Sequence, residues 1–170
     1  KYNSSVHTHL SETRAQMEFA KKRYKCGVVE HLNKLGILSE RWSFAHSIWL
    51  NESEIDIISK RKVNVVLNPL SNLIMGSSIP MIKKFKQYGI NITVGTDGAN
   101  SGGTLSVLES VRLLMCLDHC KEKDRSHWFS PIDGLSMVTN NSAHALLMKN
   151  QLGSIEPGKL ADLAIICTNT

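Results

Sequence analysis

Short apolar runs alternate with helical patterns along the chain, and this alternation constrains the fold more than any other feature. Strands are predicted over residues 6–10, 42–45, 63–67 and 90–94, and each is followed by a segment with the period of an amphipathic helix. Strands joined by helices build parallel sheets. A closed barrel of eight such units needs about 250 residues, whereas the chain has 170. Four units therefore predict either a small open doubly wound sheet or half of a barrel.

The predicted helices cover the stretches between the strands and much of the chain beyond the fourth strand. Their ranges are 13–25, 28–35, 53–60, 80–88, 104–120, 131–138 and 142–148. Gly36 and Gly89 directly follow two of them, as glycine often does at a helix C-terminus. A last strand is predicted over residues 160–167.

The composition excludes several classes of protein. With 42% hydrophobic and 21% charged residues, the chain is typical of a globular protein rather than a disordered one. Its apolar runs are shorter than the roughly 18 residues that span a bilayer, and residues 1–13 hold no apolar signal-peptide core. We therefore expect a cytoplasmic protein that binds no membrane. The net charge of +5 is mild, and the lysine clusters at 21–25 and 83–86 lie in helical patterns, which favours solvated helix faces over a nucleic-acid surface.

The four cysteines do not form a recognisable zinc motif. The nearest approach is Cys116-x-x-His119-Cys120, whose spacing differs from those of zinc sites. We interpret the cysteines as buried free thiols in a reducing compartment.

Polar residues that suit catalysis follow all four predicted strands. His7, His9 and Glu12 accompany the first strand, and His46 follows the second. The third is followed by residues 68–72 (NPLSN) and the fourth by residues 95–98 (GTDG). In α/β folds the chemistry lies at the carboxyl ends of the strands, so these residues are the candidate site.

The residue types at the strand ends indicate a hydrolytic metal site. His7 and His9 are two apart on a strand and face the same side, which suits a metal pair or one ligand with a deeper supporting partner. Asp97 is a hard oxygen ligand, and Gly98 gives the backbone room to turn. His plus carboxylate with an open position is the chemistry of hydrolytic zinc. Glu12, just past the strand, is placed to act as a general base.

Each of these signals also has a plainer interpretation. A single His at a strand end is more often a hydrogen-bonded structural residue, and Asp-Gly after a strand is most often a turn. Gly98, Gly102 and Gly103 before a helix can cradle a phosphate, although neither G-x-G-x-x-G nor G-x-x-x-x-G-K-[ST] is present. The joint placement of polar residues at four strand ends favours the metal site.

Five segments together resemble the amidohydrolase superfamily. The branch that they resemble most includes atrazine chlorohydrolase, guanine deaminase and the S-adenosylhomocysteine and methylthioadenosine deaminases. In order, the segments are residues 7–13 (HTHLSET), 45–46 (AH), 68–72 (NPLSN), 95–98 (GTDG) and 152–163 (LGSIEPGKLADL). The resemblance covers essentially the whole chain.

The resemblance implies an α/β fold that is part of a larger one. The family fold is a (β/α)8 TIM barrel with a small β-sandwich built from both chain ends. Residues 1–150 are then the C-terminal half of the barrel, strands five to eight, and residues 151–170 begin the return to the sandwich. The segment Leu-Ser-Glu-Thr after His9, and the distance to Asp97, fit strand five. The family's first-strand H-x-H is therefore expected upstream, outside this chain.

The resemblance also implies a role for each candidate residue. His9 and Asp97 are metal ligands, and Asp97 is also a base. Glu12 shuttles protons, and His46 contacts the reacting group. Three further residues of the strand-end loops, Asn68, Asn72 and Gly98, line the substrate pocket. His7 is a supporting residue beneath the site. The metal is one divalent ion, zinc with iron as the alternative, and two further ligands are expected outside this chain.

The implied function is that of a metal-dependent hydrolase, a deaminase. The full-length enzyme would remove an amino group from an aromatic N-heterocycle of the aminopurine, pterin or triazine type by attack of metal-activated water. The alternatives are hydrolytic loss of chloride or an alkylamine from a triazine-like ring, and a non-catalytic fragment or binding module. Gly98 favours the deaminase, because triazine hydrolases of the family often carry a polar residue there. The expected partner is the small heterocyclic substrate. Family members commonly form homodimers, although no residue here establishes one. The 170-residue chain alone is expected to be inactive.

Overall fold

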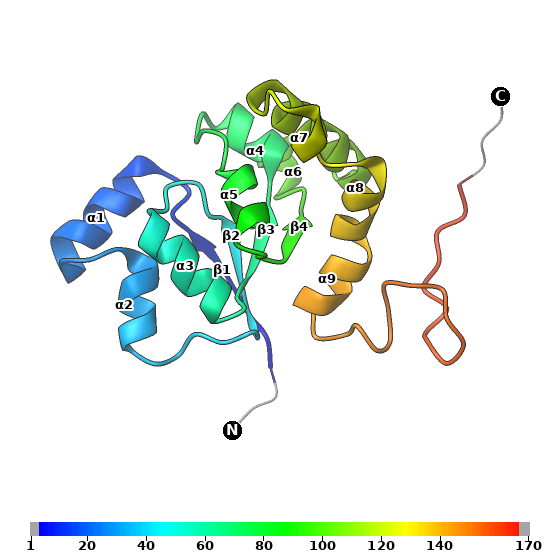
Figure 1. The fold of residues 1–170 in the computed structure, drawn as a ribbon, viewed down its shortest axis with the longest axis horizontal. Helices are drawn as coiled ribbons and strands as arrows, with labels where there is room; N and C mark the ends of the chain where they lie inside the picture. Colours follow the sequence, from blue (N-terminus) through cyan, green and yellow to red (C-terminus); the bar gives the residue numbers. More distant parts are fainter. Residues whose placement is uncertain (1–3, 167–170) are drawn as a thin grey trace.

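Four parallel strands form one sheet in the computed structural model, which describes residues 4–166 of the chain (Figure 1). The strands are β1 (Val6–Leu10), β2 (Trp42–His46), β3 (Asn64–Leu67) and β4 (Ile92–Val94). Each strand pairs in parallel with the next, in the order β1-β2-β3-β4. This order never reverses, whereas a doubly wound sheet reverses at a switch point. The open doubly wound alternative is therefore wrong.

The helices confirm most of the sequence prediction and add two short elements to it. The predicted helices between and after the strands are present, but α4 and α6 follow strands in segments that we expected to be loops. The full set is α1 (Arg14–Tyr24), α2 (Val28–Lys34), α3 (Glu52–Lys60), α4 (Pro69–Ile74), α5 (Ile82–Gln87), α6 (Ala99–Gly102), α7 (Val107–Lys121), α8 (Pro131–Val138) and α9 (Asn140–Ala145), with a 3₁₀ turn at Arg125–His127. Among the described residues, no helix combines the length and the apolar character needed to cross a membrane.

Local sequence explains where several helices begin. Thr13 accepts a hydrogen bond from the backbone N–H of Gln16, and the side chain of Gln16 accepts one from the backbone of Thr13. The same reciprocal cap opens α3, between Asn51 and Glu54. Such a capping box satisfies N–H groups that the first helical turn leaves without partners.

The hydrophobic core lies between the sheet and the helices. Phe44, Val65 and Leu67 alternate toward this side of the sheet and are fully buried. They form one cluster with helical side chains that include Ile55 and Leu114. Burial of each such side chain stabilises the fold by roughly 1.5–3 kcal/mol. The helices thus hold one face of the sheet, and the other face is left for polar residues.

The opposite face of the sheet carries polar residues in rows that run across the strands. His7 is in register with Ser43, and Ser43 with Asn64. The Nδ1 atom of His7 and the hydroxyl of Ser43 lie 2.8 Å apart, and the side chain of Asn91 donates to Asn64 at 2.8 Å. The next row, one step nearer the carboxyl edge, begins with His9. Histidine side chains of β1 therefore lie away from the helix layer.

The outer edge of β4 is capped by a side chain from α9. The backbone of β4 bonds to β3 through residues 91 and 95, so the carbonyl of Ile92 points away from β3. The side-chain amide of Asn141 donates to this carbonyl at 2.9 Å. Asn141 therefore occupies a position where a neighbouring strand would place an N–H group.

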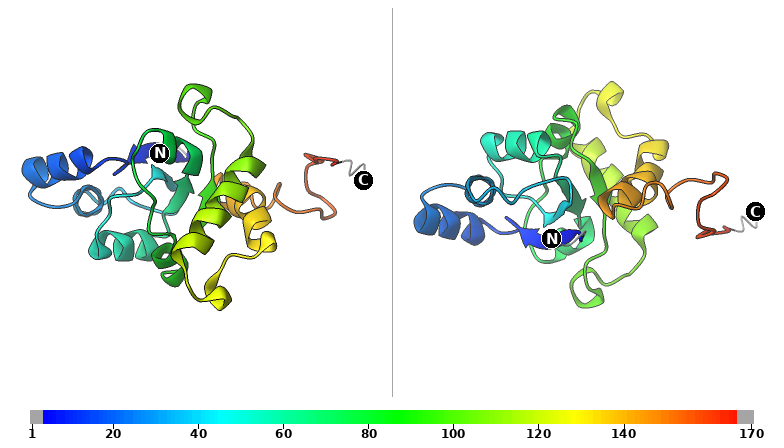
Figure 2. Two further views of the ribbon diagram at one scale, coloured as in Figure 1. Left: turned by 90° about the horizontal axis from the view of Figure 1, so that it is seen from above. Right: turned by 90° about the horizontal axis from the view of Figure 1, so that it is seen from below.

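The tail after α9 contains no strand within residues 160–166, so the prediction of a last strand is wrong there. The rest of that predicted strand, Cys167, lies outside the described residues. Ile165 is 91% exposed and Ile166 is 69% exposed. A strand needs a partner for its backbone groups, and the tail leaves the body of the fold instead of joining the sheet (Figure 2).

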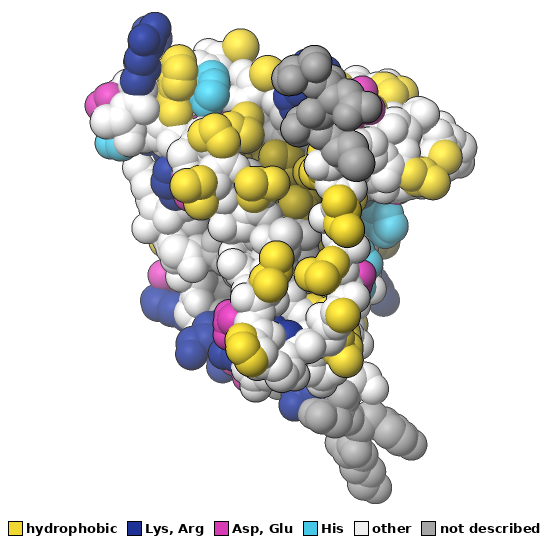
Figure 3. All heavy atoms as spheres, turned by 90° about the vertical axis from the view of Figure 1, so that its right-hand side faces the viewer, with side chains coloured by type: hydrophobic (Ala, Val, Ile, Leu, Met, Phe, Trp, Pro, Cys, Tyr) yellow, Lys and Arg dark blue, Asp and Glu magenta, His cyan; other side chains and the backbone are white. Residues whose placement is uncertain are grey.

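Apolar side chains gather on the side of the molecule that carries α8, α9 and the tail (Figure 3). The exposed side chains of these elements include Ile132, Leu135, Leu146, Ile155 and Leu160. Exposed apolar side chains that gather on one side of a molecule are typical of a surface that another segment or protein covers.

Candidate metal centre

Three side chains from three strand ends converge at the carboxyl edge of the sheet. His9 comes from β1, His46 ends β2, and Asp97 follows β4. Each offers one ligand atom, and these atoms all lie within 4.8 Å of one another. The rings of His9 and His46 have centroids 5.0 Å apart, and His46 Nε2 lies 3.9 Å from Asp97 Oδ2. Two imidazoles and a carboxylate are a donor set that suits zinc.

Left-handed backbone turns His46 and Asp97 toward this centre. His46 is in register with Leu10, a core residue, so regular alternation would direct its ring to the helix layer. Instead His46 has φ 67°, Ser47 has φ 51° and Asp97 has φ 60°. Each such non-glycine residue costs roughly 1–2 kcal/mol, and strain of this kind clusters at functional sites.

The turn after β4 differs from the sequence expectation. We expected Gly98 to supply the backbone freedom there. Gly98 has φ −70°, a value that any residue adopts, and Asp97 itself carries the left-handed conformation. The strained residue is therefore the one that carries the carboxylate.

His46 presents a nitrogen lone pair to the centre. The ring is fully buried, and its Nδ1 lies 2.7 Å from the amide oxygen of Asn72. Because an amide oxygen only accepts, Nδ1 carries a proton, and in the neutral form of the ring Nε2 carries none. Nε2 is buried without a hydrogen-bond partner in the described part of the chain. A buried polar atom without a partner is costly, and a cation or a water molecule is the partner that this lone pair fits.

Asp97 is held in its ionised form. The hydroxyl of Ser71 donates to Oδ2 at 2.6 Å, and the backbone N–H of Gly98 donates to Oδ1 at 2.7 Å. Burial alone would raise the pKa of Asp97, but these hydrogen bonds and the nearby His46 and His9 outweigh it and hold the pKa below its ordinary value. An anionic oxygen is thus available at the centre.

His7 lies one row below His9 and does not join the converging set. Burial, followed by the charges of His9 and His46, lowers the pKa of His7. Its Nδ1 faces Ser43, as described above. A neutral imidazole in this position is consistent with a supporting residue beneath the centre.

Glu12 lies beside the centre rather than in it. It is two residues beyond β1 and half-buried, and its Oε1 accepts a hydrogen bond from Ser77 at 3.3 Å. Its backbone N–H donates to Gln16, which ties it to the start of α1.

The segment after β3 is largely buried at its start. Asn72 is 1% exposed and spends its amide oxygen on His46, while Asn68 is 5% exposed. A Cβ atom at Gly95 would lie 2.6 Å from the amide oxygen of Asn68, so glycine makes room for it. The sequence prediction named both asparagines but missed Ser71 and Ser77, since a serine in a short polar segment gives no signal of the carboxylate that it contacts.

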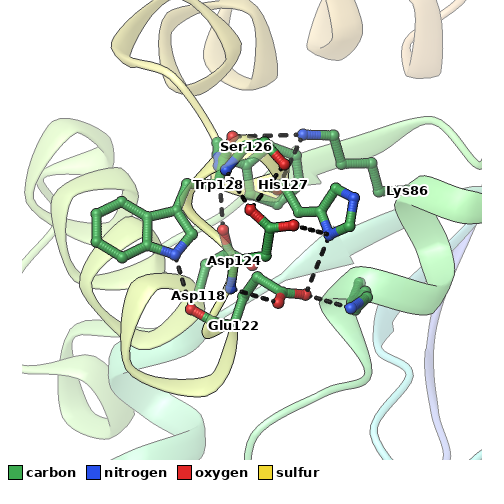
Figure 4. Close-up of polar contacts among 9 residues, drawn as sticks. Lys86, Asp118, Glu122, Asp124, Ser126, His127 and Trp128 are labelled. Carbon is green, nitrogen blue, oxygen red and sulfur yellow. Dashed lines mark hydrogen bonds and ion pairs between the residues drawn. The ribbon is translucent and has the colours of Figure 1, made fainter.

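A second group of titratable residues lies in the connection between α7 and α8 (Figure 4). Glu122 forms an ion pair with Lys83 of α5, and hydrogen bonding by Lys83 lowers the pKa of Glu122. The indole N–H of Trp128 donates to the carbonyl of Glu122 at 2.7 Å. A lysine already neutralises the carboxylate, so these contacts fasten a loop and do not resemble a cation site.

The structure gives no support to a metal site built from Cys116, His119 and Cys120. Cys116 and Cys120 are exposed free cysteines, which corrects the expectation that they are buried. The ring of His119 stacks on Trp128 with centroids 4.0 Å apart.

Comparisons with known proteins agree with the geometry of the sheet and its edge. The Amidohydrolase family matches residues 1–169. A 5'-deoxyadenosine deaminase of Methanothermobacter thermautotrophicus is 34% identical over 163 residues, which cover 96% of this chain and 38% of the relative. The chain thus spans well under half the length of the curated relatives that it matches.

Two zinc-bound crystal structures resemble the fold. An adenosine deaminase from Xanthomonas campestris is 30% identical with a TM-score of 0.87, and the match covers 93% of this chain and 36% of that one. An atrazine chlorohydrolase from Arthrobacter aurescens is 26% identical with a TM-score of 0.88, covering 94% and 35%. With its unreversed parallel sheet and its strand-end donor set, this chain belongs to the amidohydrolase family.

Proposed function

We propose that the full-length protein is a metal-dependent hydrolase that removes an amino group from an aromatic N-heterocycle. The observation that carries the proposal is the convergence of His9, His46 and Asp97 at one edge of the sheet, with a buried lone pair on His46. The names of the relatives support it, because they include deaminases of 5'-deoxyadenosine and of methylthioadenosine and S-adenosylhomocysteine. An aminopurine nucleoside is accordingly the first substrate class to test.

His9 and Asp97 are the metal ligands in this proposal, and zinc is the metal. Zinc in two structural neighbours supports this choice, and iron is the alternative. A divalent ion bound there supplies the Lewis acidity that makes water a nucleophile at neutral pH. Two further ligands come from a part of the protein outside this chain.

The remaining residues move protons and orient groups. Asp97, ionised by its hydrogen bonds from Ser71 and Gly98, accepts the proton of the attacking water. Glu12 protonates the ring nitrogen next to the reacting carbon, which makes that carbon electrophilic. His46, unprotonated at Nε2, accepts a hydrogen bond from the hydroxyl that forms on the carbon. The amino group then takes the proton from Asp97 and leaves as ammonia, while the new hydroxyl gives its proton to Glu12 and becomes the carbonyl of the product.

The substrate pocket follows from the same edge. Gly98 and Asn68 form part of its wall, and Gly98 keeps that wall open because it has no side chain. Asn72 acts on the substrate indirectly, through His46, since its amide oxygen is already bound to that ring. His7 supports the pocket floor.

We further propose that residues 1–150 form strands five to eight of a (β/α)8 barrel and that residues 151–170 begin a small β-sandwich. The sheet order without reversal supports the barrel, because neighbouring strands in a barrel follow the chain. The exposed apolar residues of the tail, such as Ile155 and Ile165, support a sandwich partner that covers them.

Hydrolytic loss of chloride or an alkylamine from a triazine-like ring is the second candidate. The high structural similarity to an atrazine chlorohydrolase favours it. The two reactions share the attack of water on an electron-poor ring carbon and differ in the leaving group. A direct comparison of products therefore separates them.

The test uses full-length protein loaded with zinc. Ammonia release is measured with 5'-deoxyadenosine, adenosine, guanine, a pterin and an aminotriazine, and chloride release with a chlorotriazine. Glu12→Gln should abolish turnover and retain zinc, whereas Glu18→Gln, an exposed carboxylate paired with Arg14 on α1, should change neither. Full turnover in Glu12→Gln would reject the role of Glu12. Absence of both products in the wild type would favour a non-catalytic binding module.

A further inference from the structure

Ser77 joins the segment after β3 to the carboxylate of Glu12. We propose that Ser77 is the positioning residue for Glu12 and that it holds the carboxylate at the rim of the metal centre. The inference rests on the proposed function, in which Glu12 carries the proton to the ring. It adds a residue from a different strand loop to that step.

The backbone of Ser77 is held by hydrogen bonds at both its N–H and its carbonyl group. It is only 5% exposed. Its backbone N–H donates to the carbonyl of Asn72 at 2.8 Å, and its carbonyl accepts from the indole N–H of Trp49 at 3.0 Å. Its hydroxyl donates to Glu12 Oε1 at 3.3 Å. A hydroxyl on a backbone held at two points is a rigid donor.

The end of α4 explains how Ser77 reaches this position. Gly76 has φ 67° and its N–H donates to the carbonyl of Leu73, while the N–H of Ser77 reaches back to Asn72. These two bonds are the Schellman motif, in which a left-handed residue ends a helix. The motif turns the chain sharply at Gly76, and the next residue, Ser77, is the one that faces Glu12.

The same segment contacts the other functional groups of the edge. Three of its side chains each form one hydrogen bond to a group at or just beyond the end of a different strand. These pairs are Ser71 with Asp97, Asn72 with His46, and Ser77 with Glu12. One short helix with its capping turn therefore fixes the relative positions of three groups that lie far apart in sequence.

Glu12 needs such a contact more than the other two groups do. His46 is fully buried and Asp97 is held by a backbone N–H as well, whereas Glu12 is half-buried. A Glu side chain loses rotamer freedom when it is ordered. A hydrogen bond that keeps its carboxylate near the substrate therefore raises the fraction of molecules that are ready to transfer a proton.

The experiment compares three variants of the full-length, zinc-loaded protein with the wild type. Ser77→Ala removes the hydroxyl, Ser77→Thr keeps it, and Ser78→Ala removes a neighbouring exposed hydroxyl as the matched control. Loss of this hydrogen bond should lower kcat of Ser77→Ala about tenfold, with KM and zinc content unchanged. Ser77→Thr should recover most of kcat, and Ser78→Ala should equal the wild type.

Two results would overturn the inference. One is a wild-type kcat in Ser77→Ala, and the other is an equal loss in Ser77→Ala and Ser77→Thr, since threonine retains the hydroxyl. A readout that does not depend on turnover is the position of Glu12 in crystal structures of the wild type and Ser77→Ala. The carboxylate should leave its wild-type position in the variant. An unmoved carboxylate would reject Ser77, whereas an inactive wild type with a displaced carboxylate in the variant would reject only the proposed reaction.

Discussion

Asn72 and His46 are joined by a 2.7 Å hydrogen bond between the amide oxygen of the first and Nδ1 of the second. The bond lies in the interior, since Asn72 is 1% exposed and His46 is fully buried. It fixes the proton on Nδ1 and leaves the lone pair of Nε2 facing Asp97. One amide from the segment after β3 thus decides which nitrogen of a histidine on β2 is available for chemistry.

Asn72→Leu should remove the contact that keeps the proton of His46 on Nδ1. Without the amide oxygen, nothing selects the Nδ1–H tautomer, and second-layer partners of this kind typically contribute 10–100-fold in activity or metal affinity. We expect kcat to fall by about that factor. Nitrogen-15 NMR of His46 should show its two ring nitrogens shifting toward each other. Asn150→Leu, at an exposed position, should leave both readouts unchanged, and unchanged His46 shifts in Asn72→Leu would contradict the assignment.

Loss of the carboxylate at position 97 should weaken zinc binding. Asp97→Asn removes the negative charge, and Ser71→Ala removes only a hydrogen bond to it. We expect Ser71→Ala to lower zinc affinity about 10–100-fold and Asp97→Asn to lower it further. Competition with a chromophoric chelator measures both. Asp56→Asn, in an exposed pair with Lys60, is the control, and equal affinity in Asp97→Asn and Asp56→Asn would exclude Asp97 as a ligand.

Glu54 should make stability depend on pH. It is 2% exposed, and burial raises its pKa even though backbone N–H groups of Asn51 and Val29 donate to its carboxylate. A group whose pKa is raised in the folded state contributes stability that is fully present below its unfolded-state pKa. That contribution is lost as pH rises through the folded-state pKa. The free energy of unfolding of the wild type, minus that of Glu54→Gln, should therefore decrease as pH rises above the ordinary glutamate pKa of about 4.3.

Denaturant titrations of the two proteins at several pH values give this difference directly. Glu52→Gln, an exposed site on the same helix, serves as the control. A difference between wild type and Glu54→Gln that rises with pH would show that the hydrogen bonds outweigh burial.

Two glycines should separate stability from activity. A Cβ atom at Gly76 would meet nothing within 4 Å, so Gly76→Ala costs only the left-handed backbone, about 1–2 kcal/mol. A Cβ atom at Gly134 would lie 2.8 Å from Val111, so Gly134→Ala strains the packing of α7 on α8 by about 1–3 kcal/mol. Both variants should unfold at lower denaturant. Only Gly76→Ala should lower kcat, because Ser77 follows it, and an equal effect of both on kcat would reject the link.

The sequence predicted the sheet well because strand signals are local. The bounds of β1 were predicted at Val6–Leu10, and the other three strands were predicted within two residues of their observed bounds. Helix α4 was missed because its six residues, which follow Asn68 and begin with Pro69, show no helical period. The strand predicted over residues 160–167 fails in its described part because β-branched residues favour a strand only where a partner is present.

The candidate site was only partly visible in the sequence. Residue type and position at the strand ends were enough to predict that His9, His46 and Asp97 belong to one site. The contacts of Ser71 and Ser77 were not visible, because they cross between loops 26 and 65 residues apart. The left-handed backbone of His46 was also missed, since nothing in a β-strand sequence marks a non-glycine residue that reverses its side chain.

The cap that Asn141 places on the carbonyl of Ile92 has a consequence for how the sheet can grow. A further strand that pairs with β4 finds the carbonyl of Ile92, at the N-terminal end of β4, already hydrogen-bonded to Asn141. Its backbone hydrogen bonds are therefore directed to the C-terminal end of β4, next to Asp97. In the proposed barrel, closure of the sheet along β4 and completion of the metal's ligand set would then depend on the same few residues. By mass action, a cation that binds the completed ligand set of the proposed barrel would stabilise the closed sheet by an amount that grows with the logarithm of its concentration divided by its Kd.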